Sequence, residues 1–206
     1  VFLARMASLS RTQTLLLQGP SGGARLRDIV RTELLAHGWE EGGRLSISGP
    51  PVTLTQREAQ ALSMAIHELS TNAVKHGAFA VPDGHLEIEW QVETLDEVPW
   101  LRLVWRESGI RIERSNDGDG FGTDLIGRGV PYMLGGTSNL DFTPTGLVCT
   151  VAFPLGAWAR PAGSCAPPAR RPASRLLIAA MRAARMSTNE AEIRHSRQAF
   201  GSTTNW

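Results

Sequence analysis

The stretch HELSTNAVKHG, residues 67–77, places an acid, a carboxamide, a lysine and a histidine at helical spacing. Successive residues of a helix are about 100° apart, so polar and apolar positions separate into stripes. The polar stripe spans roughly 100° and consists of Glu68, Asn72, Lys75 and His76. The neighbouring apolar stripe consists of Leu62, Ile66, Leu69 and Ala73. The pattern predicts a helix with one face toward a core and the next toward a cleft.

The residue types of the polar stripe suit a metal-bound nucleotide. Asn72 offers a neutral oxygen to a hard cation such as Mg²⁺, and Lys75 offers a point positive charge to phosphate oxygens. Glu68 can hold a metal-bound water or accept a proton. An ordinary solvated helix face is the alternative. Lys75 is the only lysine among 21 Lys and Arg residues, whereas a solvated face would be expected to use arginine as the rest of the chain does.

Length and charge indicate one folded domain followed by a tail. The chain has 206 residues and 42% hydrophobic content, enough for one sizeable core. Residues 1–156 hold 13 Arg and Lys against 18 Asp and Glu, a net charge of −5, and residues 157–206 hold 8 Arg against 2 Glu, a net charge of +6. An acidic body argues against a nucleic-acid-binding surface. The Ala, Pro and Arg composition from Gly156 onward predicts a disordered tail.

Neither a membrane segment nor a cysteine framework is expected. The sequence has no apolar run near the roughly 20 residues that cross a bilayer and no signal-peptide pattern, so we expect a cytoplasmic chain. Cys149 in an apolar strand and Cys165 in a Pro-rich stretch lack the spacing of metal ligands or of a disulfide framework. Val1 opens the chain inside an apolar periodic pattern, so further sequence is expected upstream.

The periodicities predict an α+β fold, a two-layer sandwich with helices on one face of a mixed, mainly antiparallel sheet. Thr55 and Glu58 form a capping-box pattern before the long helix that ends at His76, and Gly77 is expected to close that helix. Gly38 stops an earlier helix. The remaining expected helices are 1–18, 24–37 and 123–134, and the expected strands are 44–48, 85–92, 100–107, 137–142 and 147–154.

Two further motifs complete a candidate nucleotide site. A period of two puts Leu101, Leu103, Trp105 and Glu107 on the same strand face. A carboxylate there needs donors, because burying it unpaired is costly. The adenine amine is such a donor and Trp105 would wall the ring or support the acid, although Glu107 turned to solvent is an equal alternative. Downstream, GFGTDLI (residues 120–126) puts glycines before a helix start, where backbone amides approach phosphates.

In this order, these motifs resemble the ATP-binding domain of sensor histidine kinases, with the Bergerat fold shared with gyrase, Hsp90 and MutL. The resemblance is to the HWE subgroup, named for a histidine in the Asn box and a Trp-x-Glu in the first glycine box. Here these are His67 and the segment Trp105-Arg106-Glu107. The resemblance covers about residues 1–155. It implies a dimerisation helix hairpin ending in residues 1–18, a catalytic domain over residues 19–156, and a tail over residues 157–206.

The resemblance also implies the site. The implied cofactors are ATP and Mg²⁺. Asn72 is expected to bind the metal and Glu68 to support the network of metal-bound waters. His67 is counted with these two as a catalytic residue, with a role in positioning. The implied nucleotide-binding residues are Lys75, His76, Trp105, Glu107, Gly109, Gly120, Phe121, Gly122 and Leu125. The implied partners are a phosphoacceptor helix domain, a response regulator receiver domain and, in the full-length protein, a second copy in a homodimer.

Two departures from the family pattern limit these expectations. The family usually continues Trp-x-Glu with Gly-Gly-Pro, whereas this chain reads Ser108-Gly109-Ile110-Arg111, so a less mobile lid or a lower nucleotide affinity is expected. The phosphate-accepting histidine of a His-Arg-x-Lys-Asn motif has no counterpart among the five histidines. We therefore expect ATP binding with little autokinase activity. A related serine kinase or ATP hydrolase, or a non-catalytic module that binds a regulator, are the alternatives.

Overall fold

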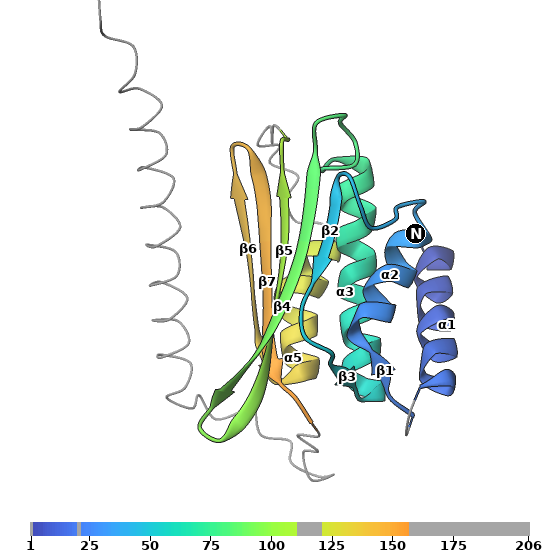
Figure 1. The fold of residues 1–206 in the computed structure, drawn as a ribbon, viewed down its shortest axis with the longest axis vertical. Helices are drawn as coiled ribbons and strands as arrows, with labels where there is room; N and C mark the ends of the chain where they lie inside the picture. Colours follow the sequence, from blue (N-terminus) through green and yellow to red (C-terminus); the bar gives the residue numbers. More distant parts are fainter. Residues whose placement is uncertain (1, 20–21, 111–120, 157–206) are drawn as a thin grey trace, which may run out of the picture. The chain divides into compact units, whose positions relative to one another are not determined.

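The computed structural model of the chain describes residues 2–19, 22–110 and 121–156 (Figure 1). All of these residues belong to one compact unit. The predicted tail and Gly120 lie outside the described residues, as does Cys165. Within the described part of the chain, no helix is both long and apolar enough to span a membrane.

A five-stranded sheet forms one layer, with the strand order β2-β4-β5-β7-β6. Its edge strand β2 (Leu45–Ser48) is parallel to β4 (His85–Leu95), and all other neighbours are antiparallel. The other three strands are β5 (Val98–Ser108), β6 (Thr137–Thr143) and β7 (Gly146–Pro154). The predicted mixed, mainly antiparallel sheet is thereby confirmed.

Helices form the second layer on one face of that sheet (Figure 1). They are α1 (Phe2–Gln18), α2 (Leu26–Leu35), α3 (Gln56–Lys75) and the segment that follows β5 in the described chain. Thr55 caps α3 with the predicted capping box, because its side chain accepts from the Glu58 amide while the Glu58 carboxylate accepts from the Thr55 amide. The long central helix therefore starts at the residue that the sequence predicted.

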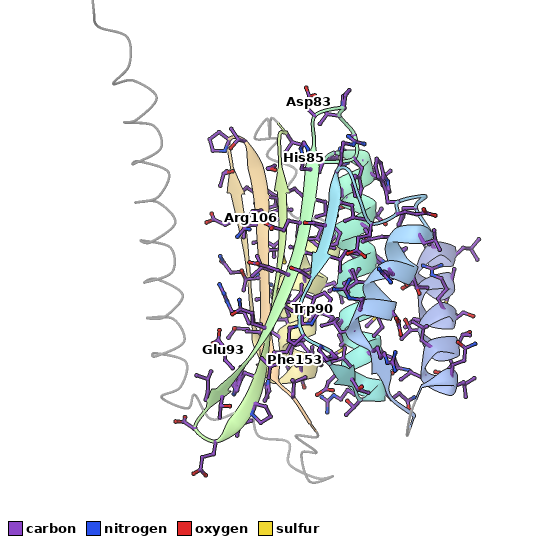
Figure 2. The ribbon with its side chains drawn as sticks, viewed as in Figure 1. Asp83, His85, Trp90, Glu93, Arg106 and Phe153 are labelled. Atoms are coloured by element: carbon purple, nitrogen blue, oxygen red, sulfur yellow. The ribbon has the colours of Figure 1, made fainter. Side chains whose placement is uncertain are left out.

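The core lies between the two layers. The apolar stripe of α3 is fully buried, with Leu62, Ile66, Leu69 and Ala73 at most 1% exposed. Side chains of the strands alternate between the two faces of the sheet: Trp90 lies on the face covered by helices and Arg106 on the open face (Figure 2). Burying one such large apolar side chain contributes about 1.5–3 kcal/mol, so this layer contact fixes which face of α3 is left for polar residues.

Three local expectations were wrong or incomplete. The helix predicted over 123–134 begins at Phe121 and is broken into α4 (Phe121–Asp124), a π-helical turn η2 (Leu125–Gly129) and α5 (Val130–Leu134). η2 contains two glycines, which have a low helix propensity and so weaken the α-helix at this point. The helix expected over 24–37 is α2, which spans only Leu26–Leu35, because Ala24 and Arg25 form a short strand. That strand, β1 (Ala24–Arg25), pairs with β3 (Thr53–Leu54), and neither was predicted, since two residues are too short to show a period.

Gly77 has a different function from the expected helix stop. The helix is capped at His76, and a Cβ atom at position 77 would lie 1.9 Å from Oε2 of Glu107. No side chain fits in that space, so glycine is required for the close approach of β5 to the end of α3. This contact joins two segments that are 30 residues apart and carry the two main candidate motifs.

Candidate functional site

The polar stripe of α3 becomes more exposed to solvent toward the C-terminal end of the helix. Glu68 is 8% exposed, Asn72 is half-buried, and Lys75 and His76 are exposed. The four side chains keep the predicted common face, because the apolar stripe beside them is held in the core. The helix therefore presents an acid near its middle, then a carboxamide one turn later, then two basic groups at the end.

The segment after the glycine-rich motif lies directly on this face. A Cβ atom at Gly122 would be 2.9 Å from Oε2 of Glu68, so a larger residue there would press on the carboxylate. Gly122 and Glu68 are 54 residues apart, and their contact joins two predicted motifs. Leu125, also expected at the site, is half-buried and packs against the core. The side chain of Phe121 lies outside the described residues.

Glu68 is anchored on its other side. Its Oε1 atom accepts a 2.6 Å hydrogen bond from Nε of Arg5 on α1. The two carboxylate oxygens therefore have different surroundings: Oε1 is held by a cation, and Oε2 faces the Gly122 backbone. Sequence reasoning missed Arg5, since no pattern links residue 5 to residue 68.

Glu107 occupies the buried end of β5. It is 2% exposed, so the alternative of an acid turned to solvent is excluded. Trp105 donates its indole N–H to Oε1 at 2.8 Å, and the backbone N–H of Ala78 donates to Oε2 at 2.7 Å. Trp105 thus supports the acid, one of the two functions considered for it. A carboxylate has about four lone-pair directions, so two donors leave capacity for another.

The pKa of Glu107 responds mainly to the burial of its carboxyl group. Burial raises the pKa of Glu107, and the hydrogen bonds from Trp105 and Ala78 offset only part of that effect. Both donors are neutral. With only two donors in place, the carboxyl keeps lone pairs for a further N–H donor.

Gly109 follows immediately after β5, with a left-handed φ of +75°. A Cβ there would lie 2.2 Å from the carbonyl oxygen of Asp83. The single glycine retained after the Trp-x-Glu motif is thus required by the packing of the chain. Gly120, the first glycine of the downstream motif, lies outside the described residues.

His67 lies apart from the polar stripe. It is 5% exposed, and its Nδ1 atom is 3.3 Å from Oε2 of Glu33 on α2. Glu33 also accepts hydrogen bonds from Ser8 and Arg11 of α1. Burial alone would raise the pKa of Glu33, but its donors, led by His67 and Arg11, outweigh burial and hold that pKa below its usual value. His67 therefore belongs to a buried polar cluster between three helices.

Metal binding by protein groups alone is not favoured here. Across residues 2–19, 22–110 and 121–156, no three His, Cys, Asp or Glu side chains gather closely enough to hold an ion. Mg²⁺ commonly uses one or two protein oxygens together with substrate phosphates and waters. The half-buried Asn72 carboxamide beside Glu68 fits that smaller ligand set.

Comparisons with known proteins agree with this fold. The family model for the HWE histidine kinase matches residues 1–51. Blue-light-activated histidine kinase 1 of Erythrobacter litoralis is 40% identical over 115 residues, 54% of this chain and 31% of that protein. The blue-light-activated histidine kinase of Brucella anthropi is 29% identical over 157 residues, 76% of this chain and 32% of that protein. The chain thus spans about a third of the length of these relatives.

A solved structure gives the same result for the fold. The histidine kinase domain from the Erythrobacter litoralis EL346 blue-light-activated histidine kinase superposes with a TM-score of 0.56. The match covers 74% of this chain and 73% of that domain at 16% sequence identity. The predicted resemblance is confirmed: the chain carries an HWE histidine kinase match at its N-terminal end and the fold of a histidine kinase catalytic domain.

Proposed function

We propose that this chain binds Mg-ATP on the polar face of α3 and transfers the γ-phosphoryl group to a histidine nitrogen of a phosphoacceptor helix domain. The phosphoryl group then passes to an aspartate of a response regulator receiver domain. One observation carries the proposal: Glu68 of the acid-Asn-Lys helix lies against Gly122 of the glycine-rich motif. These are the two segments that a bound triphosphate would need together.

Each proposed residue has a distinct task. Asn72 holds the metal through its carboxamide oxygen, and Glu68 orders the metal's waters through Oε2. Lys75 and His76, at the exposed end of α3, lie where the Lys75 charge and an N–H of the His76 ring can approach phosphate oxygens. Mg²⁺ supplies neutralisation of the triphosphate charge. Phosphoryl transfer depends mostly on positioning and electrostatic stabilisation, which suits a site of fixed polar side chains.

The adenine is proposed to donate its exocyclic amine to Glu107. The supporting geometry is a buried carboxylate with neutral donors and unused lone pairs. The backbone around Gly109, Gly120 and Gly122, together with Phe121 and Leu125, is proposed to line the nucleotide. The domain assignment is also part of the proposal: residues 1–18 end a dimerisation hairpin, residues 19–156 form the catalytic domain, and residues 157–206 form a tail.

The proposal is tested with the Asn72→Ala variant by isothermal titration calorimetry with ATP, with and without Mg²⁺. We expect the magnesium-dependent part of the affinity to be lost, because the carboxamide oxygen is the proposed protein ligand, while thermal unfolding is nearly unchanged at this half-buried position. Asn139→Ala on β6 serves as the matched control. Equal Mg-ATP affinity of wild type and Asn72→Ala would remove Asn72 from the metal site.

A further inference from the structure

Three side chains of helix α1 lie toward the part of α3 that carries the proposed catalytic carboxylate, Glu68. They are Arg5, Ser8 and Arg11, spaced three residues apart and therefore on neighbouring turns. Ser8 is fully buried, and the side chains of Arg5 and Arg11 are 25% and 28% exposed. The two arginines are only partly exposed, so solvent screens their ion pairs less than it would at a fully exposed surface.

The first contact is direct. Arg5 Nε donates to Oε1 of Glu68 at 2.6 Å, a charge-assisted hydrogen bond to a side chain that is only 10% exposed. Because Oε1 is occupied, the rotation of the carboxylate is restricted and Oε2 stays against Gly122. The orientation of Glu68 thus depends on a residue from another helix.

The second contact reaches the neighbouring residue of α3 through α2. Arg11 donates to both oxygens of Glu33, at 3.3 Å and 2.7 Å, and Ser8 donates to Oε1 at 2.9 Å. Glu33 in turn lies 3.3 Å from His67 Nδ1. An ionised carboxylate only accepts, so Nδ1 of His67 carries the proton in this contact. His67 and Glu68 are consecutive, and both are therefore tied to α1.

We propose that α1 positions the carboxylate of Glu68: Arg5 holds it directly, and the cluster of Ser8, Arg11, Glu33 and His67 fixes the turn of α3 that carries it. Arg5 is a positioning residue, since it acts through Glu68. The assignment gives His67 a physical role as the anchor of that turn to α2. It rests on the proposed function, because only a metal-bound nucleotide makes the orientation of Oε2 consequential.

The test uses the full chain and calorimetry with three probes: Mg-ATP, metal-free ATP and adenosine. Arg5→Ala is expected to weaken Mg-ATP binding about tenfold, the loss typical of one charge-assisted hydrogen bond. Adenosine affinity is expected to stay within about twofold, because its amine contact is on β5. Arg31→Ala, which removes a surface partner of Glu41 on α2, serves as the matched control and should bind Mg-ATP like wild type.

A double-mutant cycle separates positioning from general loss of stability. Glu68→Gln alone should also weaken Mg-ATP, and combining it with Arg5→Ala should add little further loss, because both changes remove the same constraint. Arg5→Lys should recover part of the affinity, and thermal unfolding of each variant is measured in parallel. If Arg5→Ala unfolds the chain, Arg5→Lys and Arg11→Ala replace it, with a smaller loss expected for each.

The outcomes distinguish the two proposals. Additive losses in the cycle, equal weakening of adenosine and Mg-ATP, or wild-type Mg-ATP affinity in Arg5→Ala would each overturn the positioning role of Arg5. A wild-type chain that is folded but does not bind Mg-ATP would reject the proposed function itself. Selective and non-additive loss of Mg-ATP affinity supports both.

Discussion

Two buried glutamates, Glu33 and Glu107, are nearly equal in exposure, at 1% and 2%, yet their chemistry differs. Glu33 receives its hydrogen bonds from Arg11, His67 and Ser8. Cationic and polar donors hold the pKa of Glu33 below its usual value although burial acts to raise it. Glu107 has only an indole and a backbone amide, so burial raises its pKa. At nearly equal exposure, the neighbours therefore decide in which direction the pKa of a buried acid shifts.

The difference separates the structural role of Glu33 from the ligand-binding role proposed for Glu107. The carboxylate of Glu33, on α2, has hydrogen-bond partners on both α1 and α3, so it links three helices. Glu107 has two donors from its own strand and from the end of α3, and it retains acceptor capacity. We therefore expect loss of Glu33 to be felt mainly in stability and loss of Glu107 mainly in nucleotide selectivity.

The largest expected effect is on folding. Glu33→Ala should lower the free energy of unfolding by about 3–5 kcal/mol, because it leaves Arg11 without its buried counter-ion and His67 without its hydrogen-bond partner. Urea denaturation at neutral pH measures this. Glu41→Ala, which removes a half-exposed acid paired with Arg27 and Arg31, is the control and should cost less than about 1 kcal/mol. Similar losses for both variants would contradict the structural role of Glu33.

The next effect concerns the adenine end of the site. Glu107→Ala should weaken ATP by about tenfold more than it weakens the triphosphate of a purine that lacks the exocyclic amine, since only ATP loses a hydrogen bond to the acid. Calorimetry with both nucleotides measures the ratio. Glu87→Ala, on the open face of the sheet beside Arg106, is the control. A parallel loss for both nucleotides would refute the adenine contact.

The smallest expected effect is on the pH dependence of folding stability, which should have opposite signs for the two glutamates. The lowered pKa of Glu33 contributes stability that is present above the unfolded-state pKa, near 4.5, and is lost as pH falls through the folded pKa. The raised pKa of Glu107 acts oppositely: its contribution is greatest below the unfolded-state pKa and is lost as pH rises through the folded pKa.

Glu33→Gln and Glu107→Gln test these signs by chemical denaturation between about pH 3 and pH 8. The deficit of Glu33→Gln relative to wild type should shrink toward acid pH. Glu107→Gln should improve relative to wild type toward neutral pH, because wild type must then ionise a buried acid. Slopes of the same sign for both variants would show that folding shifts the pKa values of the two glutamates in the same direction, contrary to this expectation.

Much of the fold was predictable because its signals are local. The period of α3 identified the buried stripe of Leu62 and Ile66, and the capping box at Thr55 gave the helix start. The alternation of β5 placed Trp105 and Glu107 on the same face, but whether Glu107 was buried was left open until the structure showed it. Periodicity and capping act within a few residues, so a single sequence carries them in full.

Other features depend on contacts between distant segments. The π-helical turn after α4 contacts α3 and β6, which are distant in sequence. The pair of β1 and β3 is too short for a periodic signal. The partners of Glu107 come from residues 105 and 78, of which only the first is close in sequence. Cys149 was expected to be a packed thiol, and burial within β7 raises its pKa to about 12.

By itself the sequence determined the two layers, the buried stripe of α3 and the polar stripe beside it, because hydrophobic period and residue chemistry are encoded locally. Only the tertiary structure decided that Arg5 holds Glu68, that His67 is anchored by Glu33, and that Gly77 admits Glu107. These contacts join residues 30 to 63 positions apart. Their existence depends on how helices and strands pack, which no local pattern specifies.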